Sequence, residues 1–242
     1  MKKQRLDTYL IEHKFASDRN EAFVMVTEGR VFVEGQKAVS PSQFVLPTAW
    51  IEVRPLNPYV GRAAYKLEGA LKAFDVKVEG LVCVDIGAAT GGFTQVLLLR
   101  GARKVYAIDT AKGKLAPKLR EDPRVVVMEE TDIRHVERLP ELVDLATIDI
   151  SLISLTQILP HAKRLLKSNG IVIALFKPQY ETRDPAMLRH GIVKDDASRE
   201  QLLNDFIQWL AENNWHIQGK MESPIRGSEG NVEYLFMLRS KL

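Results

Sequence analysis

A glycine-rich turn between two short apolar segments constrains this fold more than any other part of the sequence. Residues 82–94 read VCVDIGAATGGFT, so an apolar run ends on Asp85 and a turn with three glycines follows. A helical stretch and a second apolar run then lead to Asp109, 22 residues after Gly87. This order is typical of the opening of a nucleotide-binding α/β unit: a strand, a glycine turn, a helix, and a second strand that ends on an acid. We therefore expect a sheet flanked by helices, with a ligand at this turn.

The spacing of the glycines indicates the kind of ligand. In the dinucleotide fingerprint G-x-G-x-x-G the second glycine lets a pyrophosphate approach, and Ala89 stands at that position here. The pattern D-x-G-x-x-x-G-G is instead that of methyltransferases that use S-adenosylmethionine (SAM), whose methionine tail carries no phosphate. An ordinary α/β turn without a ligand and a dinucleotide site are the alternatives. The residues expected to bind SAM are Asp85, Gly87, Gly91, Gly92, Phe93, Asp109 and Asp132.

Asp132 is included on a weaker signal than the others. It follows the apolar run at residues 125–128 and matches the position that reads adenine in SAM enzymes. A plain turn acid is the alternative interpretation.

Composition and charge limit the classes of function. The chain has 242 residues, 45% of them hydrophobic, which allows one large domain or one domain plus a small module. A net charge of +3 is compatible with a nucleic-acid partner without being diagnostic of one. The single cysteine, Cys83, lies inside an apolar run and is expected to be a core residue. The sequence shows no continuous apolar signal segment and no run of ~18 apolar residues, so we expect a cytoplasmic protein that binds neither membrane nor metal.

The hydrophobic pattern divides the chain into two domains. Residues 1–54 show helical spacing near the start, then a second helix that Ser17 or Asp18 can cap and Gly29 can end, then an alternating segment typical of a hairpin. In the second helix the expected inward residues are Ala22, Phe23 and Val26. Residues 55–60 contain two prolines and are expected to be a linker, and residues 61–242 form the second domain.

The second domain alternates helical and strand patterns. This alternation predicts an α/β fold with a mostly parallel, seven-stranded sheet and helices on both faces, and the close pair of strands at the C-terminus predicts an antiparallel ending. The expected helices are 62–74, 93–101, 112–119, 152–167 and 198–213, and the expected strands are 81–86, 104–109, 124–128, 143–149, 170–176, 214–221 and 231–238.

Several motifs, taken in order, resemble a known family. The N-terminal segments RLDTYL, SDRNEA and EGRVFVEG resemble the S4-type RNA-binding domain, and GRAAYKL, DIGAATGGF, DISLISL, LFKPQYE and GNVEYL resemble FtsJ-type ribose methyltransferases. The two domains in this order resemble the TlyA family of ribosomal RNA 2′-O-methyltransferases, which are often labelled haemolysins. The resemblance implies a Rossmann-like SAM methyltransferase fold behind a small α+β S4 domain, SAM as cofactor, and ribosomal RNA or a ribosomal subunit as partner. One departure is the segment after Arg54, Pro-Leu-Asn-Pro, where the family often has Arg-x-Trp-Val, which leaves open how the domains couple.

The resemblance also implies a catalytic tetrad. FtsJ-type enzymes use Lys-Asp-Lys-Glu, and the matching positions are Lys66, Asp149, Lys177 and Glu233. A ribose hydroxyl is a poor nucleophile at neutral pH, so it needs a base and close alignment. We assign Lys177 as the general base, because it follows an apolar strand, and Lys66 as the group that orients the ribose. The two acids would hold the ammonium groups and the hydroxyl.

Simpler interpretations exist for three of these four residues. Lys66 could be a solvated surface lysine, and Asp149 could cap the helix that begins near residue 152. Glu233 could point to solvent from an alternating strand.

RNA contacts are the weakest inference from composition. Arg5, Arg19 and Arg30 could line one face of the N-terminal domain and bind phosphates. A merely solvated face is the alternative. Segment 178–199, which contains Arg183 and Arg189, is a second candidate, and its irregular pattern predicts a mobile loop that closes on substrate.

Three other functions compete with RNA methylation. A catalytically weak protein that only binds RNA or SAM is disfavoured by the complete tetrad. A haemolysin that acts on membranes is disfavoured by the absence of a signal peptide, a spanning segment and a strongly amphipathic apolar helix. A nucleotide-dependent oxidoreductase is disfavoured by Ala89.

Overall fold

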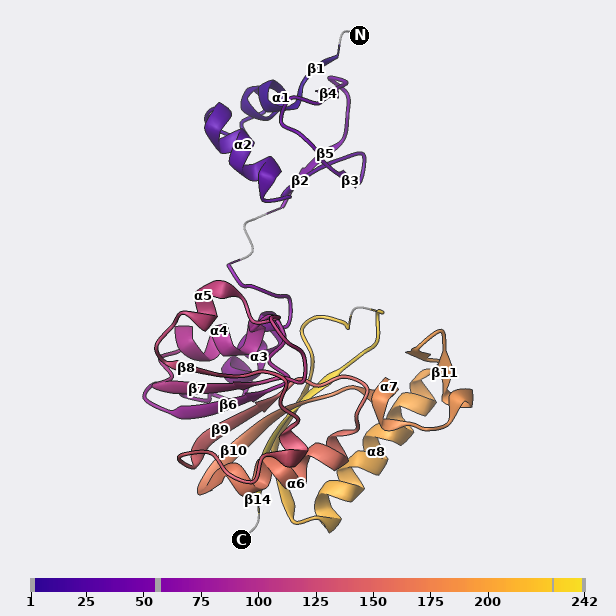
Figure 1. Cartoon of the computed structure of the whole chain (residues 1–242). Helices are drawn as coiled ribbons and strands as arrows, with labels where there is room; N and C mark the ends of the chain where they lie inside the picture. Colours follow the sequence, from indigo (N-terminus) through magenta and orange to yellow (C-terminus); the bar gives the residue numbers. More distant parts are fainter. Residues whose placement is uncertain (1–2, 55–57, 228, 241–242) are drawn as a thin grey trace. The chain divides into compact units, whose positions relative to one another are not determined.

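The chain divides into two units, Met1–Pro58 and Tyr59–Leu242. The computed structural model describes residues 3–54, 58–227 and 229–240. Half of the expected linker at 55–60 lies outside the described residues, since 55–57 are not among them. Figure 1 shows the two units.

The smaller unit packs two helices against short antiparallel strands. Asp18 accepts a hydrogen bond from the Glu21 amide at 2.8 Å, so it is the N-cap that the sequence predicted for the second helix. The predicted hairpin is present and gains a third strand by pairing with residues 51–53. The elements are β1 (Gln4–Arg5), α1 (Leu6–Glu12), α2 (Arg19–Thr27), β2 (Val31–Val33), β3 (Gln36–Lys37), β4 (Phe44–Val45) and β5 (Ile51–Val53).

One expectation about the second helix is wrong. Phe23 does not point inward, because 56% of it is exposed, whereas Met25 is 2% exposed. Residues Ala22, Met25 and Val26 have the i, i+3, i+4 spacing that places three side chains on one helix face, and this is the face that the core of the unit buries.

The larger unit is built on a seven-stranded sheet. The strand order is β13-β14-β10-β9-β6-β7-β8, with parallel pairs from β10 to β8 and antiparallel pairs on both sides of β14. This confirms the predicted α/β class and the antiparallel ending. The strands are β6 (Val82–Ile86), β7 (Lys104–Ile108), β8 (Val125–Met128), β9 (Val143–Ile148), β10 (Leu166–Phe176), β13 (Trp215–Glu222) and β14 (Tyr234–Ser240).

Helices cover both faces of this sheet. In Figure 1, α3 and α4 lie on one face and α6 and α8 on the other. All five residues of β6 are buried, as expected for a parallel strand covered on both sides. The remaining elements are α3 (Ala64–Ala73), α4 (Gly92–Leu99), α5 (Pro117–Arg120), η1 (Ile133–His135), α6 (Leu155–Leu165), α7 (Pro178–Glu181), η2 (Pro185–Met187), β11 (Leu188–Arg189), β12 (Ile192–Val193) and α8 (Asp196–Glu212).

The register of the central strands brings three chain segments to one edge. Ala174 of β10 lies opposite Ile148 of β9, and Phe176 lies opposite Tyr234 of β14. Because β14 is antiparallel to β10, its first residues lie beside the last residues of β10, whose other neighbour is β9. The residues just after β9 and β10 and just before β14 therefore share the carboxyl edge of the sheet, where open α/β folds bind their ligands.

Several element boundaries differ from the prediction. The helix expected at 112–119 is only Pro117–Arg120, since Gly113 has a φ of +65° and Pro117 stands at the first helical position. Strand β14 begins at Tyr234 rather than at residue 231. Helix α6 begins at Leu155 because Ser154 caps it.

The segment 178–199 is more ordered than predicted. It contains α7, η2 and the β11–β12 pair, and α8 already begins at Asp196. Asn231 joins this segment to the β14 side of the sheet, since its Oδ1 accepts from the Val193 amide at 3.0 Å and its Nδ2 donates to the Gly191 carbonyl at 3.0 Å.

Two general features of the described residues bear on function. None of their helices is both long and apolar enough to span a bilayer. No group of three or more His, Cys, Asp or Glu side chains among them is arranged to hold a metal ion.

Candidate active site

At the glycine turn after β6, the backbone of Gly87 packs closely against the backbone of Asp149. Gly87 has a φ of +84°, and a Cβ on it would lie 2.4 Å from the Asp149 carbonyl oxygen. Any side chain here would push apart the two strand ends. The turn lines a cavity of about 270 Å³ together with the ends of β7 and β9.

Asp109 is placed to bind hydroxyl groups in this cavity. Its Oδ2 accepts from the Ala89 amide at 2.8 Å, and its Oδ1 accepts from the Ala111 amide at 2.7 Å. Each carboxylate oxygen has a second lone pair, so the side chain is oriented and still able to accept bonds from a ribose. The residues here therefore fit a nucleoside-bearing cofactor such as SAM.

Asp85 does not line this cavity. It is completely buried, and its carboxyl oxygens accept bonds from Thr94 Oγ1 at 2.7 Å and Thr147 Oγ1 at 3.1 Å. Burial is the main reason that the pKa of Asp85 rises to about 7, and the nearby Asp149 charge adds to the rise. The position of Asp85 indicates a role in supporting the turn rather than in touching a cofactor.

The other predicted cofactor residues are divided between the cavity wall and its support. Asp132 lines the cavity, and hydrogen bonds from Arg134 lower its pKa to about 2. Gly92 and Phe93 line an adjoining hollow. Gly91 has a φ of +94°, and a Cβ on it would meet Leu119 and Leu115, so it serves packing.

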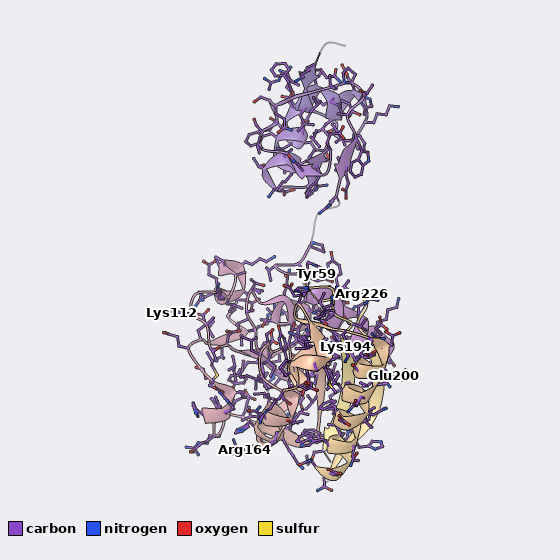
Figure 2. All side chains as sticks on the ribbon, turned by 90° about the vertical axis from the view of Figure 1, so that its right-hand side faces the viewer. Tyr59, Lys112, Arg164, Lys194, Glu200 and Arg226 are labelled. Carbon is purple, nitrogen blue, oxygen red and sulfur yellow. The ribbon has the colours of Figure 1, made fainter. Side chains whose placement is uncertain are left out.

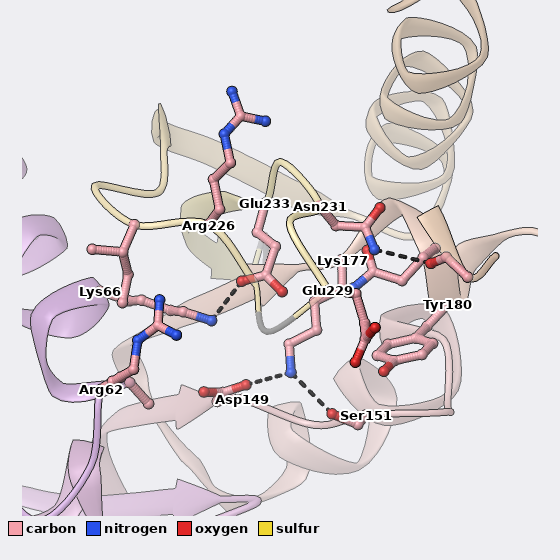
Figure 3. Close-up of a pocket in the computed structure, with 14 residues that line it drawn as sticks. Arg62, Lys66, Asp149, Ser151, Lys177, Tyr180, Arg226, Glu229, Asn231 and Glu233 are labelled. Carbon is pink, nitrogen blue, oxygen red and sulfur yellow. Dashed lines mark hydrogen bonds and ion pairs between the residues drawn. The ribbon is translucent and has the colours of Figure 1, made fainter. Parts of the chain in front are cut away.

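The four residues of the predicted tetrad surround one cavity of about 220 Å³. Lys66 comes from α3, Asp149 follows β9, Lys177 follows β10, and Glu233 precedes β14. Lys66 Nζ donates to Glu233 Oε2 at 2.5 Å, and Lys177 Nζ lies 2.6 Å from Asp149 Oδ1. Figure 3 shows both pairs pointing into the same space.

These pairs are shielded from water. Lys66 and Lys177 are each 8% exposed and Glu233 is 2% exposed. A buried charge without a partner is strongly unfavourable, so each lysine and its acid depend on one another. The simpler interpretations are therefore wrong: Lys66 is not a solvated lysine, and Glu233 does not face solvent. Asp149 is not a helix cap either, because Ser154 caps α6.

The two cavities adjoin one another at the end of β9. Asp149 and Ser151 line both of them, and Ser151 Oγ accepts a bond from Lys177 Nζ at 3.1 Å. A group held at the glycine turn and a group held among the lysines would therefore meet beside Asp149. This is the arrangement that a transfer between two bound molecules requires.

Several residues around the tetrad were not predicted. The additional lining residues include Arg62, Ser151, Gln179, Tyr180, Arg226 and Asn231. All of these except Arg226 lie inside the motifs that carried the family resemblance, so these motifs are the sequence signal that points to them.

The structure brings only some of the predicted RNA-binding arginines together. Arg5 and Arg19 line a common hollow on the smaller unit. Arg30 is outside that hollow and donates to the Arg54 carbonyl at 3.0 Å. Arg183 and Arg189 are exposed on the larger unit but do not line the tetrad cavity.

Comparisons with known proteins agree with this architecture. Residues 59–240 match the model of the FtsJ-like methyltransferase family, and residues 4–51 match the S4 domain. The chain is 38% identical over 234 residues to Hemolysin A of Brachyspira hyodysenteriae, covering 96% of this chain and 98% of the relative. It is also 38% identical over 244 residues to the 16S/23S rRNA (cytidine-2′-O)-methyltransferase TlyA of Mycobacterium tuberculosis, covering 99% and 91%.

A solved structure extends the likeness to three dimensions. A Streptococcus thermophilus protein described as a hemolysin superposes with a TM-score of 0.76 at 34% identity, covering 100% of this chain and 90% of its own. With an S4 domain followed by an FtsJ-like domain, the chain belongs to the TlyA/hemolysin A family of SAM-dependent methyltransferases.

Proposed function

We propose that this protein methylates the 2′-hydroxyl of a cytidine in ribosomal RNA, with SAM as the methyl donor. The name of the Mycobacterium tuberculosis relative supports the substrate, and the match of the N-terminal residues to the S4 domain supports binding to RNA. The expected cytoplasmic setting follows from this substrate and stays a prediction.

One observation carries the proposal: two buried lysine–carboxylate pairs surround a cavity that opens onto the glycine turn. A binding protein has no need to hold two lysine–carboxylate pairs largely out of water beside its ligand, because buried ion pairs contribute little net stability. An enzyme that must move a proton and align a hydroxyl needs such groups.

Each residue has a role that follows from its position. Asp109 would hold the ribose of the cofactor in the cavity that the Gly87 turn also lines. When bound, SAM supplies the methyl group that the 2′-oxygen receives. Lys177, in its neutral form, would accept the proton of the 2′-hydroxyl.

The remaining tetrad residues would position the base and the ribose. Asp149 and Ser151 hold the Lys177 side chain in place by accepting bonds from Nζ. Lys66, oriented by Glu233, would place the ribose and add a second positive charge beside Lys177.

The Lys177→Met substitution tests the assignment of the base. We expect transfer of labelled methyl groups to ribosomal RNA to fall about 10²–10⁴-fold, the usual loss of a positioned base, with SAM affinity by calorimetry nearly unchanged. Lys177→Arg should restore little activity, because a guanidinium stays charged and cannot accept the proton.

A matched control is Lys112→Met. Lys112 is exposed, paired with Glu130, and lies in Figure 2 at the edge of the larger unit opposite Arg226. This variant should keep full activity. Near-normal turnover by Lys177→Arg would refute the base role, and calorimetry that shows binding of NAD but not of SAM would refute the proposed function.

A further inference from the structure

A buried hydrogen-bond acceptor in the tetrad cavity is left unpaired. Among the side chains of the described residues, Gln179 Oε1 is the one buried polar atom without a hydrogen-bond partner. Buried polar groups are nearly always paired, because an unpaired acceptor loses its bonds to water without compensation. Other atoms of Gln179 line the cavity, so a turn of its carboxamide would bring this oxygen to a donor on a bound substrate.

The other buried acceptors of this cavity are already engaged. Glu233 accepts from Lys66, Asp149 lies in its ion pair with Lys177, and Asn231 Oδ1 accepts from the Val193 amide. Among the described residues, Gln179 Oε1 is thus the buried side-chain acceptor of this cavity that no protein group satisfies.

The neighbouring residue indicates which part of a nucleotide lies here. Tyr180 lines the same cavity, and its ring centroid is 5.9 Å from Lys177 Nζ. Figure 3 places the ring on the far side of the cavity from Lys66. Aromatic side chains are the usual stacking platforms for unstacked RNA bases. A ribose beside Lys177 would thus leave its base near the Tyr180 ring, in the cavity that Gln179 also lines.

We propose that Gln179 is the base-selecting residue of this enzyme, its carboxamide oxygen accepting a hydrogen bond from the exocyclic amino group of the target cytosine. The inference rests on the proposed function and adds to it the contact that distinguishes cytidine from uridine. Cytosine presents an N4 amino donor, whereas uracil presents an oxygen acceptor at that position. A site built to pair a donor discriminates strongly against a ligand that lacks it.

The test compares three bases at one RNA position. The methylated nucleotide is first mapped on ribosomal RNA, and RNA fragments are then made with cytidine, uridine or a 2-pyrimidinone nucleoside there. The last of these carries hydrogen in place of the amino group. The full-length wild-type protein should prefer cytidine by at least about tenfold in kcat/KM over both analogues.

Two variants of Gln179 separate recognition from structure. Gln179→Leu should lower kcat/KM on cytidine by about 10- to 100-fold and remove the preference over 2-pyrimidinone. Gln179→Glu should keep the preference, because a carboxylate remains an acceptor and cannot rotate to present a donor. SAM affinity should stay at the wild-type value in both variants, and the unfolding midpoint should stay at the wild-type value in Gln179→Leu.

Defined results would overturn the inference. If Gln179→Leu lowers kcat/KM equally on all three substrates, the side chain contacts the ribose or supports α7 and does not read the base. If the wild type treats cytidine and 2-pyrimidinone alike, the amino group is not recognised. A wild-type protein that methylates no ribosomal RNA would instead refute the proposed function itself.

Discussion

Asp85 allows a quantitative prediction about stability and pH. Its side chain is fully buried between Thr94 and Thr147, and burial is the largest cause of a pKa of about 7, against an ordinary value of 3.8. The hydrogen bonds from the two threonines oppose this rise without cancelling it. In the unfolded chain the same carboxyl ionises near its ordinary pKa.

The sign of the effect follows from proton binding. Between about pH 4 and pH 7 the native state keeps a proton that the unfolded state releases, so the free energy of unfolding falls as the pH rises. A difference of about three pH units corresponds to at most about 4 kcal/mol, lost between pH 4 and pH 7 and constant above. Asp85→Asn does not titrate, and a threonine hydroxyl can donate to its oxygen or accept from its amide.

The assay is urea unfolding at several pH values from 5 to 8. We expect the unfolding free energy of the wild type to fall by up to about 1.4 kcal/mol per pH unit relative to Asp85→Asn. A Trp50→Phe background restricts tryptophan fluorescence to the larger unit, since Trp209 and Trp215 both lie there. Asp75→Asn, at an exposed position, is the control and should run parallel to the wild type. If the unfolding free energies of Asp85→Asn and the wild type change with pH in the same way, the reasoning is refuted.

Three further predictions concern the cofactor, the tetrad and the RNA contacts. Asp109→Ala should weaken SAM and S-adenosylhomocysteine binding by about 10- to 100-fold in calorimetry, because a hydrogen bond to a charged acceptor contributes about 1.5–3 kcal/mol; unchanged affinity would contradict the ribose contact. Gly227→Ala should lower the rate of methyl transfer while SAM affinity stays constant, since a Cβ there would lie 2.6 Å from Glu233 Oε1; full activity would show that the Glu233 carboxylate need not stay in place. Combined Arg5→Gln and Arg19→Gln should weaken RNA binding and lower the dependence of log K on log salt by about one for each lost phosphate contact; an unchanged salt slope would contradict phosphate binding at this hollow.

Local sequence pattern was enough for the framework of the larger unit. The apolar segment before Asp85 was predicted as a strand and lies in β6, because a parallel strand covered on both faces is apolar along most of its length. The glycine turn was predicted for the same kind of reason, since Gly87 stands where a Cβ would strike the backbone. Such constraints act on consecutive residues and can be read without knowledge of the rest of the chain.

Boundaries and helix faces were less predictable. Phe23 was expected inside and is exposed, whereas Met25 is buried. Both residues suit a helix, and the choice between them depends on which face the remaining elements cover. Segment 178–199 was expected to be irregular, but Asn231, far along the chain, satisfies the backbone at Gly191 and Val193 and so helps to order it.

The site itself depended on tertiary structure. The sequence, through its family resemblance, named Lys66, Asp149, Lys177 and Glu233, but it did not show which acid pairs with which lysine. The pairing follows from the register of β9, β10 and β14, which brings three distant segments to one edge of the sheet and leaves α3 to supply Lys66. The unpaired oxygen of Gln179 could be recognised only in the folded chain, because whether a polar atom has a partner is a property of everything packed around it.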